Sequence, residues 1–363
     1  MKKTLALVLA LAMVLSFAAM ASAAVTVGGN LRVWYGDSDN GTSKVSSIKF
    51  DRLALDVNAD LGDNSGLITE VQFRNILTNA STGTVTGTVG SDGTSVTGTS
   101  TNSTDIRVDL AYWYKKNLFM DGGTLMVGAF DGQVPFKNGY SNVLINGGLG
   151  DALKIGNSVG VVYQINQPTY AFGVGVVNGK TNVDRDSTYT AAQEDEGFDW
   201  SARFDYLPAA GLKIGVGYAN VFEKFANATA QSGKIMDNRW IVDASYKNLD
   251  VTPFSGMVEY AKVSPDSGSV LTDDAAAIYG ELGYTFGSAV AYVGRGIGLD
   301  DKNVYGTIIT STLFGGSSAP LINNYTVVGL NYGLTKSTFL QGEYVDVSGS
   351  DSRSFGLRLR VNF

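Results

Sequence analysis

Residues 25–35, Val-Thr-Val-Gly-Gly-Asn-Leu-Arg-Val-Trp-Tyr, alternate between two kinds of side chain. The odd positions from Val25 to Tyr35 are mostly apolar, whereas the even positions include Asn30, Arg32 and Trp34. Successive side chains of a β-strand point to opposite faces, so this stretch predicts a strand with one apolar and one polar face. A barrel strand that faces lipid outside and water inside needs this pattern over about ten residues. We therefore expect an all-β, transmembrane antiparallel β-barrel.

The links between the alternating stretches are short and long in turn, which favours a membrane barrel over a soluble sandwich. Such barrels have short turns at one rim and long loops at the other. Counting the links gives sixteen strands at about ten residues each. Weak alternation between residues 289 and 323 leaves fourteen or eighteen strands as alternatives. Short turns are predicted at 62–66, 115–123, 166–168, 207–211, 247–250, 286–288 and 333–336.

Aromatic residues recur just before the short turns, and a soluble sandwich gives no reason for that placement. In membrane proteins Tyr and Trp collect where hydrocarbon meets the headgroups. We expect Tyr112 and Tyr114 to face outwards and Trp113 to face inwards. The predicted outward ring at the short-turn rim also contains Tyr163, Phe204, Tyr206, Tyr246, Tyr284, Tyr332 and Phe363, and the ring at the long-loop rim contains Tyr35, Phe73, Tyr218, Tyr260 and Tyr344.

Residues 1–23 have the form of a secretory signal, with Lys2 and Lys3, an apolar run, and the small residues Ala21-Ser22-Ala23. Cleavage after Ala23 would leave residues 24–363 as one outer-membrane β-barrel domain, although a retained anchor is an alternative. The whole chain carries 34 acidic and 27 basic side chains, a net charge of −7. Phosphate binding needs a basic face, so this balance argues against a nucleic-acid partner.

The chain contains no cysteine and no histidine. This absence excludes the Ser-His-Asp triad, Cys-His catalysis and nearly all ordinary zinc sites. We therefore expect neither an enzyme nor a bound cofactor or metal. Acidic loop clusters such as Asp273-Asp274 could hold divalent cations that bridge to lipopolysaccharide, but solvated loop tips are the simpler interpretation.

Arginines occupy the polar face of the first four predicted strands. An inward arginine meets water, whereas one that points into mid-bilayer lipid would cost about 2–4 kcal/mol. The inward arginines could create a field that orients solutes and biases ion choice, or could pair with acids such as Asp56, Glu70 and Asp109. The expected basic wall consists of Arg32, Arg52, Arg74 and Arg107, extended by Arg358 and Arg360 on the closing strand.

The organisation of the whole mature chain resembles the bacterial general porins, which are sixteen-stranded, trimeric outer-membrane channels. Residues 354–363 alternate and end in Phe363, a long loop at 131–157 follows the fifth strand, and arginines lie on the first strands. The resemblance implies a homotrimer with an infolded third loop, in which Asp131, Lys137 and Asp151 would line the constriction. It also implies that Phe363 is the signal read by the barrel insertion machinery.

These observations predict a bacterial outer-membrane porin, a water-filled channel for passive diffusion of small hydrophilic solutes and ions. One alternative is a substrate-selective channel in which Trp34 and Trp113 form part of a sliding surface. A closed structural or adhesive barrel is another, and a barrel lipase or protease is disfavoured without histidine. The inner arginines favour anions and the acidic outer loops favour cations, so ion preference is left open.

Overall fold

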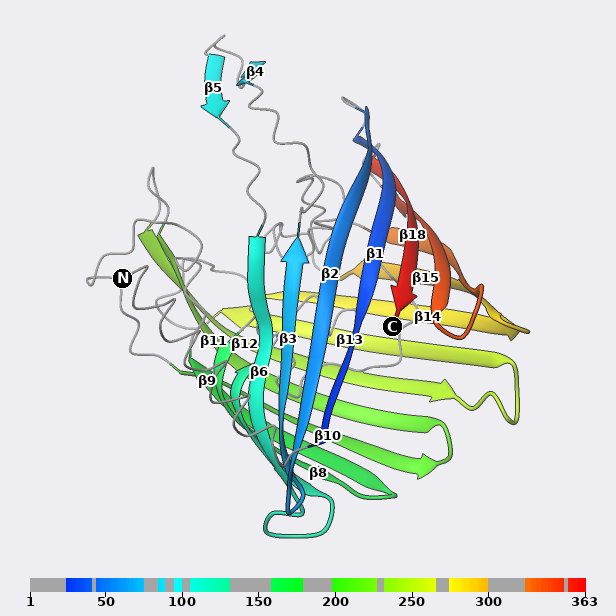
Figure 1. Ribbon diagram of the computed structural model, residues 1–363. Coiled ribbons are helices and arrows are strands. Elements are labelled where there is room, and N and C mark those ends of the chain that lie inside the picture. The colour runs from blue at the N-terminus through cyan, green and yellow to red at the C-terminus, as the bar shows by residue number, and fades with distance from the viewer. Residues whose placement is uncertain are drawn as a thin grey trace.

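The computed structural model is a closed antiparallel β-barrel of sixteen strands (Figure 1). Strands follow chain order around the ring, and β1 (Ala24–Asn40) pairs with β18 (Ser352–Asn362) to close it. At this seam Gly29 N donates to Phe363 O at 2.9 Å and Phe363 N donates to Gly29 O at 3.1 Å. The predicted fold class and strand count are confirmed. The structure describes residues 24–40, 44–74, 84–88, 95–99, 105–130, 158–178, 198–226, 232–265, 274–299, 324–348 and 352–363.

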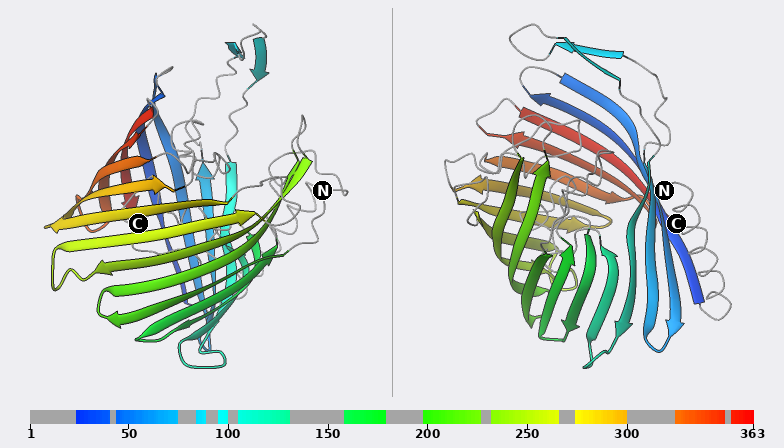
Figure 2. Two further views of the ribbon diagram at one scale, coloured as in Figure 1. Left: turned by 180° about the vertical axis from the view of Figure 1, so that it is seen from behind. Right: turned by 90° about the vertical axis from the view of Figure 1, so that its left-hand side faces the viewer.

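The remaining strands run in order between β1 and β18 (Figures 1 and 2). No helix among the described residues is long and apolar enough to cross a membrane. The other barrel strands are β2 (Lys44–Gly62), β3 (Ser65–Arg74), β6 (Asp105–Lys116), β7 (Gly123–Phe130), β8 (Ser158–Asn166), β9 (Tyr170–Asn178), β10 (Phe198–Ala209), β11 (Leu212–Ala226), β12 (Ser232–Lys247), β13 (Phe254–Pro265), β14 (Ala275–Phe286), β15 (Ala289–Gly298), β16 (Tyr325–Gly333) and β17 (Thr338–Val347).

A separate two-stranded sheet is formed by β4 (Thr84–Thr88) and β5 (Ser95–Thr99). Both strands fall in a tract rich in Thr, Ser and Gly at residues 78–104, which lies in the long link between β3 and β6. Both segments contain valine and threonine, residues with a high preference for strands. The tract therefore contains a hairpin that the sequence reasoning missed.

Side chains on the barrel strands alternate between a buried inner face and an exposed outer face. On β12, Arg239, Ile241 and Asp243 are buried, whereas Trp240 and Val242 are exposed. Because the ring is closed, the alternation separates an interior from an exterior around the whole circumference. Every barrel strand is hydrogen-bonded on both sides, which is the condition that a lipid environment imposes on backbone N–H and C=O groups.

The seven predicted short turns join the strands at one rim of the barrel (Figure 1). Between β2 and β3, Asp63 and Asn64 take φ values of 49° and 59°. Two consecutive residues with positive φ fit the tight turns that match the twist of a two-stranded hairpin. Asp and Asn tolerate this backbone better than other residues with a side chain, so the local sequence specifies the turn.

The aromatic rings predicted from sequence are largely where they were expected. At the short-turn rim, outward aromatic side chains lie close together, as in the pair Phe254 and Tyr284, whose ring centroids are 5.0 Å apart. At the long-loop rim, Tyr35 and Phe355 are 6.4 Å apart. The exposed aromatic residues at the short-turn rim include Phe204, Tyr206, Phe254, Tyr284, Phe286, Tyr332 and Phe363.

A β-bulge in β6 breaks the alternation. Asp109 is an extra residue relative to β3, because Glu70 pairs with Leu110 and Val71 pairs with Val108. One inserted residue moves the side chains that follow it to the opposite face of the sheet. The face predicted for the second half of this strand is therefore reversed.

The bulge corrects three expectations. Tyr112 pairs with Ile68, on the inner face of β3, and Tyr114 points inwards with it. Trp113 pairs with Leu67, whose side chain is exposed on the outer face. Tyr112 and Tyr114 are therefore not outward girdle residues, and Trp113 is not an inner-wall residue. The sequence pattern predicted the wrong face for these residues because apolar and polar residues continue to alternate through Asp109.

Tyrosine rings cover glycines on the inner face of β14 to β16. The ring of Tyr292 lies over Gly329, so that a Cβ added to Gly329 would meet Tyr292 Cζ at 2.1 Å. A Cβ added to Gly294 would likewise meet the hydroxyl oxygen of Tyr279 at 2.4 Å. An aromatic ring packed over a strand glycine shields the exposed backbone and fixes the register. These inner-face glycines are thus required by the close approach of their neighbours.

We predict that Gly329→Ala destabilises the barrel by about 1–3 kcal/mol, because the added methyl group displaces the ring of Tyr292. Gly342→Ala is the matched control, since its Cβ would meet only Leu357 Cδ1 at an ordinary 3.7 Å. The control should change stability by less than about 0.5 kcal/mol. Reversible urea unfolding in lipid vesicles measures the free energy of unfolding of both variants. Equal losses of stability would contradict the packing argument.

Candidate functional site

Four arginines occupy directly paired positions on four neighbouring strands. Arg360 on β18 pairs with Arg32 on β1, Arg32 pairs with Arg52 on β2, and Arg52 pairs with Arg74 on β3. We call these residues the basic row. Arg107 follows on β6, where its backbone pairs with Gln72 of β3. The side chains of Arg74 and Arg107 lie outside what the structure describes.

The basic row is partly neutralised by neighbours on the same wall. Arg52 Nη1 lies 3.4 Å from Glu70 Oε1, and both side chains are half-buried. Arg360 Nε donates a hydrogen bond of 2.8 Å to Asn362 Oδ1. The row therefore combines the two possibilities derived from sequence, since it concentrates positive charge and also contains the ion pair between Arg52 and Glu70.

Arg358 lies beside the basic row, next to Trp34. Its guanidinium carbon is 5.3 Å from the centre of the Trp34 ring, within the range of a cation–π contact. Arg358 Nε also donates to Gln341 Oε1 at 2.7 Å. Trp34 is on the inner face, as predicted, but only 1% of its surface is exposed. The Trp34 ring therefore contacts Arg358 and does not present an open aromatic surface to a solute.

An acidic row lies on a different part of the wall. Asp205 on β10, Asp243 on β12 and Glu259 on β13 occupy paired positions, with Gly215 on β11 between the first two. All three acids belong to the inner set of their strands. Sequence reasoning did not identify them, although each stands between outward residues in an alternating stretch, as Glu259 does between Val258 and Tyr260.

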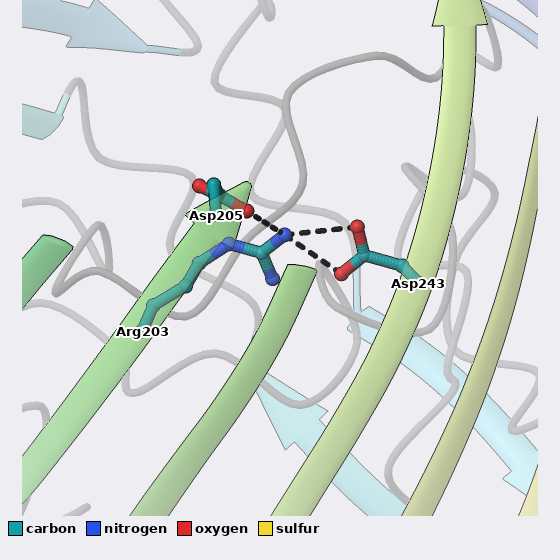
Figure 3. Close-up of polar contacts among 3 residues, drawn as sticks. All are labelled: Arg203, Asp205 and Asp243. Atoms are coloured by element: carbon teal, nitrogen blue, oxygen red, sulfur yellow. Dashed lines mark hydrogen bonds and ion pairs between the residues drawn. The ribbon is translucent and has the colours of Figure 1, made fainter. Parts of the chain in front are cut away.

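Arg203 joins the two aspartates of this row (Figure 3). Its Nη2 atom is 2.6 Å from Asp205 Oδ1 and 2.7 Å from Asp243 Oδ2. The guanidinium reaches Asp243 across β11 because Gly215 has no side chain; a Cβ there would meet Nη2 at 2.1 Å. The side chains of Arg203 and Asp243 are 4% and 0% exposed. Charges this buried hold the inner wall in one arrangement as long as they stay paired.

The basic and acidic rows face each other across the barrel. In the ring of sixteen strands, β1 and β11 are eight strands apart in either direction. The basic row spans β18 to β3 and the acidic row spans β10 to β13, so each strand of one lies opposite a strand of the other. Arg203 and Lys213 offset part of the negative charge on the β10 to β13 wall, as Glu70 offsets part of the basic row. The opposite charges that remain on the facing walls create a field across the interior.

Two more carboxylates lie on the inner wall between the two rows, one on β14 beside the acidic row and one on β17 beside β18. Tyr292 donates its hydroxyl to Glu343 Oε2 at 2.5 Å, and Tyr279 donates to Glu281 Oε2 at 3.0 Å. Both glutamates are buried on the inner face of β14 and β17. Each could have been found from sequence by its inward position, Glu281 between Gly280 and Leu282 and Glu343 between Gly342 and Tyr344.

The inner wall carries no charged side chain on β7, β8 or β9 and is largely apolar there. Phe130, Val162 and Val177 face inwards and are 5%, 2% and 1% exposed. Glycines occupy other inner positions there, such as Gly160 opposite Val177 and Gly175 opposite Val162. The expected polar inner face is only partly present in this sector, because small residues and valines stand where charges are found elsewhere, although Thr124 and Gln164 also belong to the inner set.

Several predicted site residues fall outside the described part of the chain. The third loop at 131–157 is among them, with Asp131, Lys137 and Asp151, as is the signal segment at 1–23. In the described ranges no group of three or more acidic side chains is placed to hold a metal ion. Asp274, a candidate cation ligand, instead has its Oδ2 atom 2.6 Å from Lys262 Nζ. That hydrogen bond lowers the pKa of the Asp274 carboxyl.

Comparison with known proteins identifies the fold. No protein-family model matches the chain, and no curated protein matches it. Among solved structures, OmpT of Vibrio cholerae with loop L8 deleted has a TM-score of 0.60 and 14% identity, covering 94% of this chain and 100% of that one. OmpF of Salmonella typhi, in complex with daunomycin, has a TM-score of 0.55 and 11% identity, covering 93% and 97%.

A third solved structure is the anion-selective porin of Comamonas acidovorans, with a TM-score of 0.54 and 13% identity over 94% of this chain and 100% of that one. Sequence identities this low indicate a shared fold but not a shared activity, since one fold serves unrelated functions. At the level of the fold, the predicted resemblance to bacterial porins is confirmed.

The expectation that the protein is not an enzyme is withdrawn. The chain is at least as similar to OmpT, whose structures are described only as those of an outer membrane protein, as it is to the named porins. Missing histidine and cysteine exclude particular mechanisms, whereas barrels of this shape can carry other residues and other activities. The comparisons give no positive sign of catalysis either.

We predict that Asp243→Ala destabilises the barrel by about 3–5 kcal/mol, because it leaves the buried Arg203 guanidinium without its larger share of counter-charge. Asp205→Ala is the matched control. Its side chain is 16% exposed, and Asp243 would still hold Arg203, so the loss should be clearly smaller. Thermal unfolding in detergent with both variants measures the difference, and a larger loss for Asp205→Ala would refute the assignment.

Proposed function

We propose that the protein is a porin of a bacterial outer membrane, a water-filled channel through which small hydrophilic solutes and ions diffuse passively. The observation that carries the proposal is the opposed basic and acidic rows on the inner wall of a closed barrel. Charged side chains belong on a wall that meets water, whereas the outer wall exposes apolar residues suited to lipid. The fold shared with OmpF and the anion-selective porin supports the same conclusion.

Buried polar atoms on the inner wall also support a hydrated interior. Asn30 Oδ1, Ser201 Oγ and Ser245 Oγ have no hydrogen-bond partner among the described residues. A buried polar group without a partner costs about 1–3 kcal/mol. Water in the interior would satisfy these atoms, as buried waters do in other proteins.

In this proposal the pore-lining charges are Arg32, Arg52, Arg74, Arg107, Arg358 and Arg360 on the strands. The third loop would contribute Asp131, Lys137 and Asp151, by resemblance to the porins. To these the structure adds the acidic row and two glutamates as candidates. Solutes with a dipole would turn in the field between the walls, which would orient them along the passage.

Export and assembly complete the proposal. Residues 1–23 would direct the chain across the inner membrane and be removed after Ala23. A homotrimer is supported by OmpT of Vibrio cholerae, one structure of which is described as a trimer form. The outer surface would lie against outer-membrane lipid and lipopolysaccharide, and the barrel insertion machinery would place it there.

A substrate-selective channel is the second candidate, and the apolar sector on β7 to β9 favours it. Phe130, Val162 and Val177 lie on the inner face of this sector, which adjoins the acidic row at β10 and is separated from the basic row by β6. A solute with an apolar part and a charged part could contact both kinds of wall at once. Diffusion that saturates with such solutes in liposome swelling would distinguish this version from a non-specific pore.

Planar-bilayer recording tests the pore. The pure folded protein should give stepwise ohmic conductance. If no such conductance is measured, the proposal is contradicted and a closed structural barrel is favoured. In a salt gradient, Arg52→Gln with Arg360→Gln should shift the reversal potential toward cation preference, because two positive charges leave one wall. Glu281→Gln with Glu343→Gln should shift it toward anion preference. Shifts in the same direction for both pairs would contradict the assignment of the two walls.

Phe363 is proposed as the signal read by the insertion machinery. We predict that Phe363→Ala lowers the amount of folded barrel in cells, while purified protein refolds into detergent as the wild type does. Phe254→Ala is the control, because Phe254 is a girdle aromatic of similar exposure, 59% against 61%. Equal losses in cells from both variants would leave Phe363 as one more girdle residue.

A further inference from the structure

A line of polar side chains crosses the outer surface of the barrel between β15 and β18. Arg295 on β15 pairs with Thr326 on β16, Thr326 pairs with Asp346 on β17, and Asp346 pairs with Arg353 on β18. We call these four residues the outer polar row. They belong to the outward set, since the residues beside Arg295, Gly294 and Gly296, are buried on the inner face.

The strands that carry the outer polar row have the length that just spans a bilayer. Strands β15, β16 and β17 have 10, 9 and 10 residues, whereas β1 and β2 have 17 and 19. Arg295 is the seventh residue of β15, counted from the short-turn rim. Six steps of ~3.3 Å along a strand tilted by ~40° place its Cα ~15 Å above that rim.

Arg295 therefore lies inside the outer apolar surface and not above it. The apolar band of such a barrel is ~25 Å tall. On the same strand, Val293 below Arg295 and Ile297 above it both point outwards and are 46% and 41% exposed. A guanidinium in these surroundings costs ~2–4 kcal/mol at the bilayer midplane unless a partner compensates.

The described residues supply only part of that compensation. Arg295 Nη1 donates to Thr326 Oγ1 at 2.7 Å, and this contact is exposed. A guanidinium carries five N–H donors in a planar fork, so one hydroxyl uses a small part of its capacity. The group that best matches the fork is an oxyanion bound through two parallel hydrogen bonds, a carboxylate or a phosphate.

A notch beside Arg295 offers room for a lipid. Gly280 on β14 pairs with Arg295, and a Cβ added there would meet nothing nearer than Met257 O at 4.0 Å. Val258 and Leu282, the outward apolar neighbours of Gly280, are 51% and 68% exposed. The notch is thus an open space at Gly280 between apolar side chains, on the strand beside Arg295 and on the side away from Thr326.

We propose that Arg295, together with Thr326 and the notch at Gly280, binds the phosphate of a membrane lipid whose acyl chain packs in the notch. The inference rests on the proposed membrane location and not on conduction. The long side chain of Arg295 can extend along the wall toward the headgroups of the long-loop side. A phosphate supplies a negative charge beside Arg295, since Asp346, the acid of the outer polar row, pairs with Arg353, and an acyl chain fills the space that Gly280 leaves.

The test uses the full-length protein in lipid nanodiscs that contain phosphatidylglycerol and phosphatidylcholine. Native mass spectrometry after release into detergent measures which lipid stays bound. Arg295→Gln should reduce retained phosphatidylglycerol about tenfold, since charge-assisted bonds to phosphate are the strong ones. The amount of lipid retained by Arg295→Lys should lie between that of the wild type and that of Arg295→Gln, because an ammonium cannot form the two parallel hydrogen bonds of a guanidinium. Gly280→Leu, which fills the notch, should reduce retention while leaving the charge in place.

Arg353→Gln is the matched control. Arg353 Nε is 3.5 Å from Asp346 Oδ1, and its side chain is 64% exposed, as expected for a weak surface pair. Retention in this variant should match the wild type. Equal retention in Arg295→Gln and wild type would overturn the proposal, as would displacement of the bound lipid by millimolar inorganic phosphate.

A second copy of the chain is the competing occupant of this surface. If Arg295→Gln lowered the oligomer mass without changing the bound lipid, the surface would be a subunit contact and the lipid site would be refuted. Conductance should be unchanged in every variant, because Arg295 points away from the interior. Failure of the wild type to conduct, with lipid retention still dependent on Arg295, would refute the pore alone.

Discussion

Closure of the backbone hydrogen-bond ladder is the constraint on which the rest of this structure depends. With each strand paired on both sides, no edge is left to be satisfied by water or by another chain. Side chains are then divided by a closed wall into two sets that meet different solvents. This division explains why charge is concentrated at inner positions such as Arg52 and Asp243, and why Val242 and Leu282 are exposed at outer ones.

The number of strands decides how the inner charges are related. Register sets the order within each row, so that Arg32 stands beside Arg52 and Asp243 beside Glu259. Only the ring size makes the two rows opposite, since eight strands separate β1 from β11 on each side. In a ring of fourteen or eighteen strands the same residues would no longer face one another strand by strand. The field across the interior is therefore a property of the closed ring and not of any single strand.

Much of this architecture could be predicted from sequence, because a period of two and tight turns are local properties. Asp63 and Asn64 mark a turn without help from distant residues, and the inward position of Arg32 follows from its neighbours. Register across strands is not local. The bulge at Asp109 leaves the sequence alternation intact while reversing Trp113, and the bridge from Arg203 to Asp243 depends on a glycine in a third strand. The inward position of Asp205 and Asp243 could have been predicted by the same reasoning, but their ion pairs with Arg203 could not.

The seam between β1 and β18 has a consequence for the order of events in assembly. Gly29 and Phe363 exchange two backbone hydrogen bonds although almost the entire barrel sequence separates them. The hairpins in between can form early from nearby residues, but the seam needs both extremes of the domain at once. Contacts between such distant parts of a chain are entropically costly to reach and slow to form. The cylinder must therefore seal last, and until then the polypeptide has two unpaired strand edges that a chaperone or another assembly factor would have to shield.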